Sequence, residues 1–190
     1  MSSQTKVFIA GSRSLSRLSK EVLRRIDNMV EKDFTILVGD ANGVDKAVQA
    51  YLRRKHYPKV VVFCMEGKCR NNIGQWPIEA ITAPEPSKRD FVYFSTKDRA
   101  MVQECNYGLM LWDRQSKGTL TSILDLVSSG KPTVVYVAGT RGFYSLRSYD
   151  YLREWLESVA PSAFVSLKQH LKTMPKSTAR LTTEANAQLF

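Results

Sequence analysis

The sequence lacks any apolar run long enough to cross a membrane. Its longest apolar stretches, such as residues 59–65, are far shorter than the roughly 20 residues that a membrane-spanning helix needs. The N-terminal residues also lack the charged and apolar regions of a signal peptide, and they lead directly into a strand-like segment. We therefore expect a cytoplasmic protein with no membrane among its partners.

Cysteine is scarce, and its spacing does not suggest a metal site. The three cysteines, Cys64, Cys69 and Cys105, form an odd set. Cys64 and Cys69 have no second pair that would complete the ligands of a zinc ion. The sequence therefore predicts reduced thiols, and neither a metal nor a cofactor is expected.

Acidic residues are few, at 18 against 28 lysines and arginines, and the net charge is +10. Such an excess raises the question of nucleic acid. The basic residues are spread along the chain, however, and the short clusters at 24–25 and 53–55 fall on the outer faces of expected helices. A continuous basic stripe with interleaved aromatics is missing. Nucleic acid is therefore a possible partner, ranked behind a phosphorylated small molecule.

Apolar segments of strand length alternate with segments of helical periodicity, which is typical of a parallel α/β sheet. Strands are expected at 6–11, 34–39, 59–65, 107–113 and 132–138, and helices at 17–32, 43–55, 119–130 and from residue 96 onward. Residues 66–95 are poorly periodic and predict a long loop. Because the strands lack strict alternation, both of their faces should be covered. The predicted fold class is α/β, a Rossmann-like three-layer sandwich with a mainly parallel sheet of about five strands.

The pattern changes after Gly142, which suggests a division of the chain. Residues 1–142 are expected to form the Rossmann-like domain, and residues 143–172 a C-terminal helical extension packed on it. From residue 173 to residue 190 the chain is a polar tail. A homo-oligomer is also compatible with this sequence.

Ligands of such sheets bind outside the carboxyl ends of the strands, and the first predicted strand ends in a turn suited to that role. Gly11 lets the backbone leave the strand tightly, Ser12 offers a hydroxyl, and Arg13 offers a guanidinium for phosphate or carboxylate. A plain turn with an exposed arginine is the alternative interpretation.

The second turn joins the strand that ends at Gly39 to a helix that begins at Gly43. Asn42 is placed as the N-cap of that helix, and Asp45 as a carboxylate that complements the helix dipole and bonds back to the cap. Asp40 has no such structural task. A carboxylate just past a strand suits ribose hydroxyls or a developing positive charge.

The third turn begins a helix without an acidic residue in its first turn. Ser116, Lys117, Gly118 and Thr119 bring backbone N–H groups, hydroxyls and an ammonium to one place, which favours an anion site. The spacing of a Walker loop is absent. The alternative is an ordinary capped turn.

Two further stretches could close over a ligand. Residues 69–77 carry Arg70 and Trp76, which could stack on a base or simply pack beneath the loop. Residues 95–101 place Lys97 and Asp98 at another expected helix start, where a capping role is the favoured interpretation.

The segments IAGSR, LVGDANGVDKAVQAYL and LMLWDRQSKGTLTSIL together resemble the SLOG superfamily of Rossmann-like proteins. That group is related to the LOG-type phosphoribohydrolases and to the Rossmann domain of DprA-type DNA-processing proteins. The resemblance covers roughly residues 5–138. It implies a pocket for nucleotides or nucleotide-derived molecules at the carboxyl edge of the sheet, with phosphate at the turn of residues 116–119.

The chain departs from the LOG-type pattern Gly-Gly-x-Gly-Thr-x-x-Glu. Gly118 and Thr119 remain, but the position of the glutamate holds Ser122. Cleaving an N-glycosidic bond needs a carboxylate near the sugar. Asp40, Asp113 or Glu104 would have to supply it, so catalysis is left open and binding without turnover is favoured.

The leading hypothesis is therefore a binding domain for a nucleotide or nucleotide-derived ligand. The first alternative is an N-glycoside hydrolase acting on a nucleoside monophosphate, and the second is a DprA-like protein that handles nucleic acid. The residues expected to line the ligand site are Gly11, Ser12, Arg13, Gly39, Asp40, Asn42, Gly43, Trp112, Asp113, Ser116, Lys117, Gly118 and Thr119.

Overall fold

The described part of the chain, residues 4–83 and 91–165, alternates between strands and helices in this computed structural model. In chain order its elements are β1 (Lys6–Gly11), α1 (Lys20–Glu31), β2 (Thr35–Gly39), α2 (Val44–Arg54), β3 (Val60–Met65), β4 (Ile78–Ile81), α3 (Phe91–Glu104), β5 (Tyr107–Trp112), α4 (Lys117–Ser128), β6 (Thr133–Val137), β7 (Gly142–Leu146) and α5 (Tyr149–Val159). The strands form one sheet in the order β4-β3-β2-β1-β5-β6-β7. Neighbours run parallel except β6 and β7, which are antiparallel.

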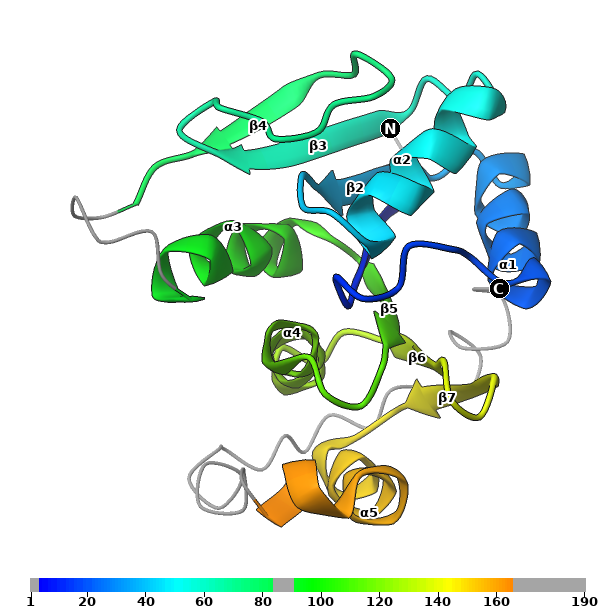
Figure 1. The fold of residues 1–190 in the computed structure, drawn as a ribbon, viewed down its shortest axis with the longest axis vertical. Coiled ribbons are helices and arrows are strands. Elements are labelled where there is room, and N and C mark those ends of the chain that lie inside the picture. Colours follow the sequence, from blue (N-terminus) through cyan, green and yellow to red (C-terminus); the bar gives the residue numbers. More distant parts are fainter. Residues whose placement is uncertain (1–3, 84–90, 166–190) are drawn as a thin grey trace.

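Helices cover both faces of this sheet (Figure 1). α1 and α2 lie on one face, whereas α3 and α4 lie on the other, with α5 beside α4 and β7. Phe8 and Ile9 of β1 are both fully buried, Phe8 in the core on the side of α3 and α4 and Ile9 in the core on the side of α1 and α2. Successive side chains of a strand point to opposite faces, so an unbroken apolar run fits a strand covered twice. The predicted Rossmann-like three-layer fold is confirmed.

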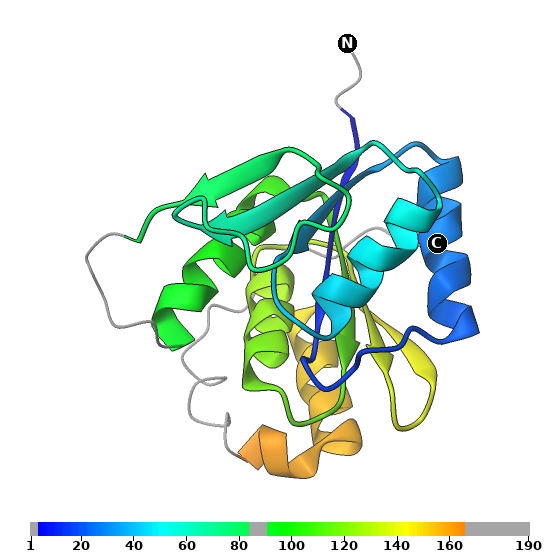
Figure 2. The ribbon, with the colours of Figure 1, turned by 45° about the horizontal axis from the view of Figure 1, so that its top comes forward.

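The strand order reverses beside β1, and this reversal positions the candidate site. The chain passes from β1 to β2 on one side, whereas β5 joins β1 from the other side. The turns after β1, β2 and β5 lie at the same edge of the sheet (Figure 2), where ligands of such folds bind. Glycine is required at Gly11, because a Cβ there would lie 2.3 Å from the carbonyl oxygen of Leu111.

The sheet is larger than the five strands expected from the sequence. β4 lies inside residues 66–95, which were expected to form a loop, and β7 lies in the region assigned to the helical extension. Both strands are at the edges of the sheet. The first three residues of β4 are exposed, and β7 is mostly half-buried. Edge strands of four and five residues therefore lack the long apolar run by which the central strands were predicted.

Two helix starts also differ from the prediction. α3 begins at Phe91, so Lys97 and Asp98 lie within the helix and do not cap it. α2 begins at Val44 after Gly43, which occupies the N-cap position with a φ of 82° in place of the predicted Asn42. This left-handed conformation favours glycine, and a Cβ there would also lie 2.4 Å from the Arg13 backbone. The last part of the predicted helical extension, residues 166–172, and the polar tail lie outside the described residues.

The prediction of reduced thiols is contradicted for two of the cysteines. Cys64 and Cys69 form a disulfide, whereas Cys105 is free and buried. The bridge joins the end of β3 to the residue before Arg70, and an odd cysteine count concealed this local pair. Within residues 4–83 and 91–165, no helix combines the length and apolar character that crossing a bilayer requires.

Thiol titration tests this bridge. After denaturation without a reductant, the protein is expected to expose one reactive thiol per chain, that of Cys105, and three after reduction. Reduction is also expected to lower the free energy of unfolding by about 2 kcal/mol, because a closed loop of this size restricts the unfolded chain. Three reactive thiols before any reductant is added would show that the two sulfurs are not bonded.

Candidate functional site

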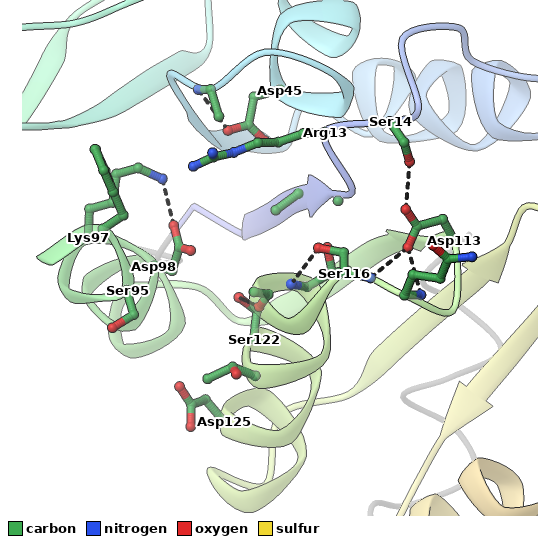
Figure 3. A pocket seen from close by; sticks show the side chains of 18 of the residues that line it. Arg13, Ser14, Asp45, Ser95, Lys97, Asp98, Asp113, Ser116, Ser122 and Asp125 are labelled. Carbon is green, nitrogen blue, oxygen red and sulfur yellow. Dashed lines mark hydrogen bonds and ion pairs between the residues drawn. The ribbon is translucent and has the colours of Figure 1, made fainter. Parts of the chain in front are cut away.

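A cavity of about 610 Å³ opens at the carboxyl edge of the sheet. Its walls come from the turns after β1, β2 and β5, from Arg70 in the loop after β3, and from α3 and α4 (Figure 3). Of the residues predicted to bind a ligand, those that line the cavity are Gly11, Arg13, Asp113, Ser116, Gly118 and Thr119. The first and third predicted turns therefore meet in one site.

The first turn of α4 forms one wall. The Ser116 hydroxyl caps this helix and accepts the N–H of Thr119 at 3.4 Å. The first N–H groups of a helix have no partner within it, so those of Lys117 and Gly118 can bind an anion. The sequence prediction placed an anion at this turn, and its backbone geometry is suited to one.

Asp113 stands beside this turn, and its carboxylate supports the turn. Its Oδ1 accepts the N–H groups of Gln115 and Ser116 at 2.9 and 2.8 Å, and its Oδ2 accepts the hydroxyl of Ser14 at 2.6 Å. Burial acts to raise the pKa of Asp113, but these hydrogen bonds outweigh it and the pKa is lowered. Asp113 therefore stays ionised and engaged with the turn, an arrangement that suits a structural anchor.

The lysine predicted at this turn lies outside the lining of the cavity. The Lys117 side chain is exposed and does not line the cavity. Arg13 does line it, and within the described residues its guanidinium forms no ion pair. Arg13 extends across the cavity toward α3 (Figure 3), with its guanidinium carbon 5.9 Å from the centre of the Phe94 ring.

A buried charge cluster forms the opposite wall. Lys97 is 4% exposed, and its ammonium donates to Asp98 Oδ1 at 2.6 Å. Asp45 is 5% exposed and accepts the Ala41 N–H at 3.1 Å. A Cβ on Gly39 would lie 2.4 Å from Asp45 Oδ2 and 2.9 Å from Lys97 Nζ, so the carboxylate and the ammonium converge over this glycine.

The pKa values in the cluster follow from burial and charge. Burial raises the pKa of Asp45 to about 6, although Lys97 opposes the shift. Burial acts to lower the pKa of Lys97, but Asp98 and Asp45 outweigh it and the pKa is raised. Asp45 lies in the first turn of α2 and bonds back to the segment before the helix, as the sequence predicted, but it also lines the cavity, which was not predicted.

Asp40 has the structural task that the sequence did not show. Asp40 is 2% exposed, and its carboxylate accepts hydrogen bonds from Arg70 Nη2 at 2.6 Å, Nε at 3.0 Å and the backbone N–H at 3.0 Å. Burial acts to raise the pKa of Asp40, but these bonds with Arg70 lower it. Asp40 does not line the cavity, whereas Arg70 does. The residue predicted to face a sugar instead fixes the loop after β3.

The remaining predicted residues support the site or lie away from it. Ser12 is buried, and its hydroxyl accepts the Asp113 N–H at 3.2 Å. The indole of Trp112 is also buried and donates to the Ser116 carbonyl at 3.0 Å. Glu104 pairs with Lys6, which begins β1 at the opposite edge of the sheet. Glu104 is therefore excluded as a catalytic group of this cavity.

Asn42 and Gly43 of the second turn and Trp76 of the predicted lid are also outside the lining. Asn42 accepts the side-chain amide of Asn71 at 3.2 Å, and Gly43 packs against the Arg13 backbone. Trp76 is 8% exposed and donates to the Tyr57 carbonyl at 2.9 Å, so it packs beneath its loop. These residues hold the loops that surround the cavity.

Several lining residues were not predicted. α4 contributes Thr121, Ser122 and Asp125, and α3 contributes Phe94 and Ser95. The α4 residues continue the face of Gly118 at spacings of three and four, a polar stripe on an otherwise apolar helix that the sequence does display. The two α3 residues were missed because this helix was expected to begin at residue 96, whereas it begins at Phe91. Among the described residues, no group of His, Cys, Asp and Glu is arranged to hold a metal ion.

The comparisons with known proteins bear on the fold. No model of a known family matches the sequence, and no curated protein matches it. DNA processing protein A (DprA) from Streptococcus pneumoniae is similar in structure, with a TM-score of 0.54, 13% identity, and coverage of 83% of this chain and 57% of that one. The chain thus spans little more than half of the pneumococcal protein.

DprA from Helicobacter pylori, described with its single-stranded DNA binding mode, has a TM-score of 0.56 at 18% identity, with 87% of this chain and 81% of that one covered. The molybdenum cofactor carrier protein of Chlamydomonas reinhardtii has a TM-score of 0.47 at 12% identity, with 90% and 99% covered. The present chain shares the Rossmann-like fold of these two DprA structures, which agrees with the structural resemblance predicted from its three turns.

Proposed function

We propose that the cavity binds a nucleotide or a nucleotide-derived ligand. The observation that carries the proposal is that the α4 N-terminus lines the same cavity as Arg13, a guanidinium that has no carboxylate partner among the described residues. Backbone N–H groups and a guanidinium together bind phosphate. The volume of about 610 Å³ lies within the usual range for small-molecule sites.

The far wall of the cavity suits the rest of such a ligand. The Phe94 ring is partly exposed there, and the guanidinium carbons of Arg13 and Arg70 lie 5.9 and 4.7 Å from its centre. An aromatic face of this kind stacks on a base. Asp98 and Asp125 bring carboxylates that can accept hydrogen bonds from ribose hydroxyls. We place this binding in the cytoplasm, where nucleotides are available.

Hydrolysis of an N-glycoside is the second candidate. The observation favouring it is Asp45, because a cavity carboxyl with a pKa of about 6 exchanges protons near neutral pH and can act as a general acid. Asp40 and Asp113, the earlier candidates, are instead held by Arg70 and by turn N–H groups. Chromatography after incubation with nucleoside monophosphates would reveal a released base.

DNA binding of the kind described for H. pylori DprA is the third candidate, supported by the fold and by the net charge of +10. An oligonucleotide in the same binding panel tests it.

Arg13→Ala is expected to weaken binding of a nucleoside monophosphate by about 1.5–3 kcal/mol, since a charge-assisted hydrogen bond is lost. Lys117→Ala removes the same charge from the exposed side of α4 and serves as the matched control, with nearly unchanged affinity. The corresponding nucleoside should bind both variants like the natural protein. Calorimetry measures the affinity of each of the two variants for the nucleotide and for the nucleoside. Equal losses for nucleotide and nucleoside in Arg13→Ala would place the phosphate elsewhere.

A further inference from the structure

A second cavity lies at the opposite edge of the sheet, where β3 and β4 begin. Its volume is about 1020 Å³, and its walls are residues 50–58 at the end of α2 and residues 73–77 before β4. Nothing in the proposed nucleotide site involves either wall. The two cavities are therefore separate features of the fold.

The charge of this cavity is of one sign. Arg53, Arg54 and His56 line it, and no aspartate or glutamate of the described residues does. The three side chains are exposed, and none has an ion pair within residues 4–83 and 91–165. The first cavity differs in this respect, because aspartates line it beside its cations. The second cavity is therefore complementary to an anion.

Cations near a helix C-terminus also stabilise the helix, and that explains part of the arrangement. It does not explain His56, which follows the helix with a φ of 51°. The N–H of His56 donates to Arg53 O at 2.9 Å and that of Tyr57 to Leu52 O at 3.0 Å, a helix ending that favours glycine in the left-handed position. Histidine adds strain there and brings an imidazole to the cavity.

The walls are held rigidly around the cationic groups. The Trp76 indole donates to the Tyr57 carbonyl at 2.9 Å and so joins one wall to the other. Asn72 closes the second wall by donating to the Trp76 carbonyl at 2.8 Å and accepting its N–H at 3.0 Å. Gln75, within this loop, has a φ of 56°, a second unfavourable conformation held by its surroundings. A preorganised wall reduces the entropy lost when a ligand binds.

We propose that this cavity is a second anion site, which binds the phosphate group of a ligand distinct from the one in the first cavity. Arg53 and Arg54 donate paired N–H groups to phosphate oxygens, and His56 adds an N–H donor. Tyr57, Trp76 and the prolines beside them offer an apolar floor to the remainder of the ligand. Both a free phosphorylated molecule and a strand of nucleic acid present this chemistry.

The indole N–H resonances separate the two cavities in one experiment. The chain has three tryptophans, and ¹⁵N spectra resolve their indoles. Trp76 reports on the second cavity through its bond to Tyr57, and Trp112 reports on the first through its bond to Ser116. Titration with pyrophosphate is expected to shift the Trp76 signal along a saturating curve. A Trp76 signal that does not move would overturn the proposal.

Arg53→Ala/Arg54→Ala is expected to raise the pyrophosphate concentration at half-saturation of the Trp76 signal at least tenfold. Arg24→Ala/Arg147→Ala removes the same charge from exposed positions outside both cavities and should change it less than twofold. Equal losses in the two double variants would mean general attraction to a basic protein. The Trp112 signal reports on binding in the first cavity. If no ligand binds in the first cavity, the Trp76 titration still tests the second one.

His56→Gly separates a ligand role from a helix-ending role. Glycine relieves the left-handed strain, so the melting temperature is expected to rise while the half-saturating concentration increases severalfold. A purely structural histidine would leave that concentration unchanged, which would contradict its place in the site.

A twelve-residue oligothymidylate identifies the source of the phosphate. Loss of its binding in Arg53→Ala/Arg54→Ala indicates a nucleic-acid strand, and unchanged binding with loss of pyrophosphate indicates a small molecule.

Discussion

Lys97→Met is expected to lower the free energy of unfolding by about 3–5 kcal/mol at neutral pH, the usual cost of leaving a buried charge without its partner. The Lys97 side chain is 5% exposed, and its ammonium is 2.6 Å from Asp98 Oδ1. It also opposes the burial of Asp45. Methionine keeps the length of the side chain and the helix propensity, so the change isolates the charge.

The double variant Lys97→Met/Asp45→Asn is the control for this result. If the cost comes from the uncompensated Asp45 carboxylate, removing that charge should restore a substantial part of the lost stability. The loss in Lys97→Met should also shrink toward pH 5, because Asp45 can then take up a proton. Urea unfolding at both pH values measures these differences. A loss below about 1 kcal/mol at neutral pH would show that the ammonium is solvated rather than buried, as is typical of exposed pairs.

The central strands could be predicted because their formation depends mainly on the local sequence. β1, β2, β3, β5 and β6 are apolar runs bounded by glycine or polar turns, and burial on both faces leaves little else that such runs can form. The position of the site followed from the parallel arrangement, since the carboxyl ends of parallel strands share one edge. The edge strands β4 and β7 could not be predicted in this way. Their pairing depends on a neighbour that is already in place.

The sequence did not show in which direction each side chain of a turn points. Asp40 and Asp45 flank the same turn, and the sequence did not show that Arg70 holds Asp40 or that Lys97 lies beside Asp45. Both cations come from distant segments that the sequence does not link to this turn. Lys117 was chosen for its place in the chain, but a side chain at the first position of α4 also has room to point to solvent.

The unusual acidity of Asp45 gives the stability of the protein a specific dependence on pH. Its pKa rises from 3.8 to about 6 on folding, mainly because the carboxyl is buried. A raised pKa means that the folded state binds the proton more tightly, so this contribution is fully present below the unfolded value and is lost as the pH rises through the folded one. The loss should reach about 2 kcal/mol between pH 4 and pH 6, out of about 3 kcal/mol for the whole transition, given 1.36 kcal/mol for each pKa unit.

Asp45→Asn is expected to abolish this dependence, because asparagine resembles the protonated carboxyl at every pH. The difference in unfolding free energy between the variant and the natural protein should change by about 2 kcal/mol from pH 4 to pH 6 in favour of the variant. Asp40 and Asp113, whose pKa values are lowered, act below this window with the opposite sign and are present in both proteins. Denaturant unfolding at intervals of half a pH unit measures the slope. Parallel curves for the two proteins would mean that Asp45 titrates as an exposed carboxyl, and the buried cluster with Lys97 would then be wrong.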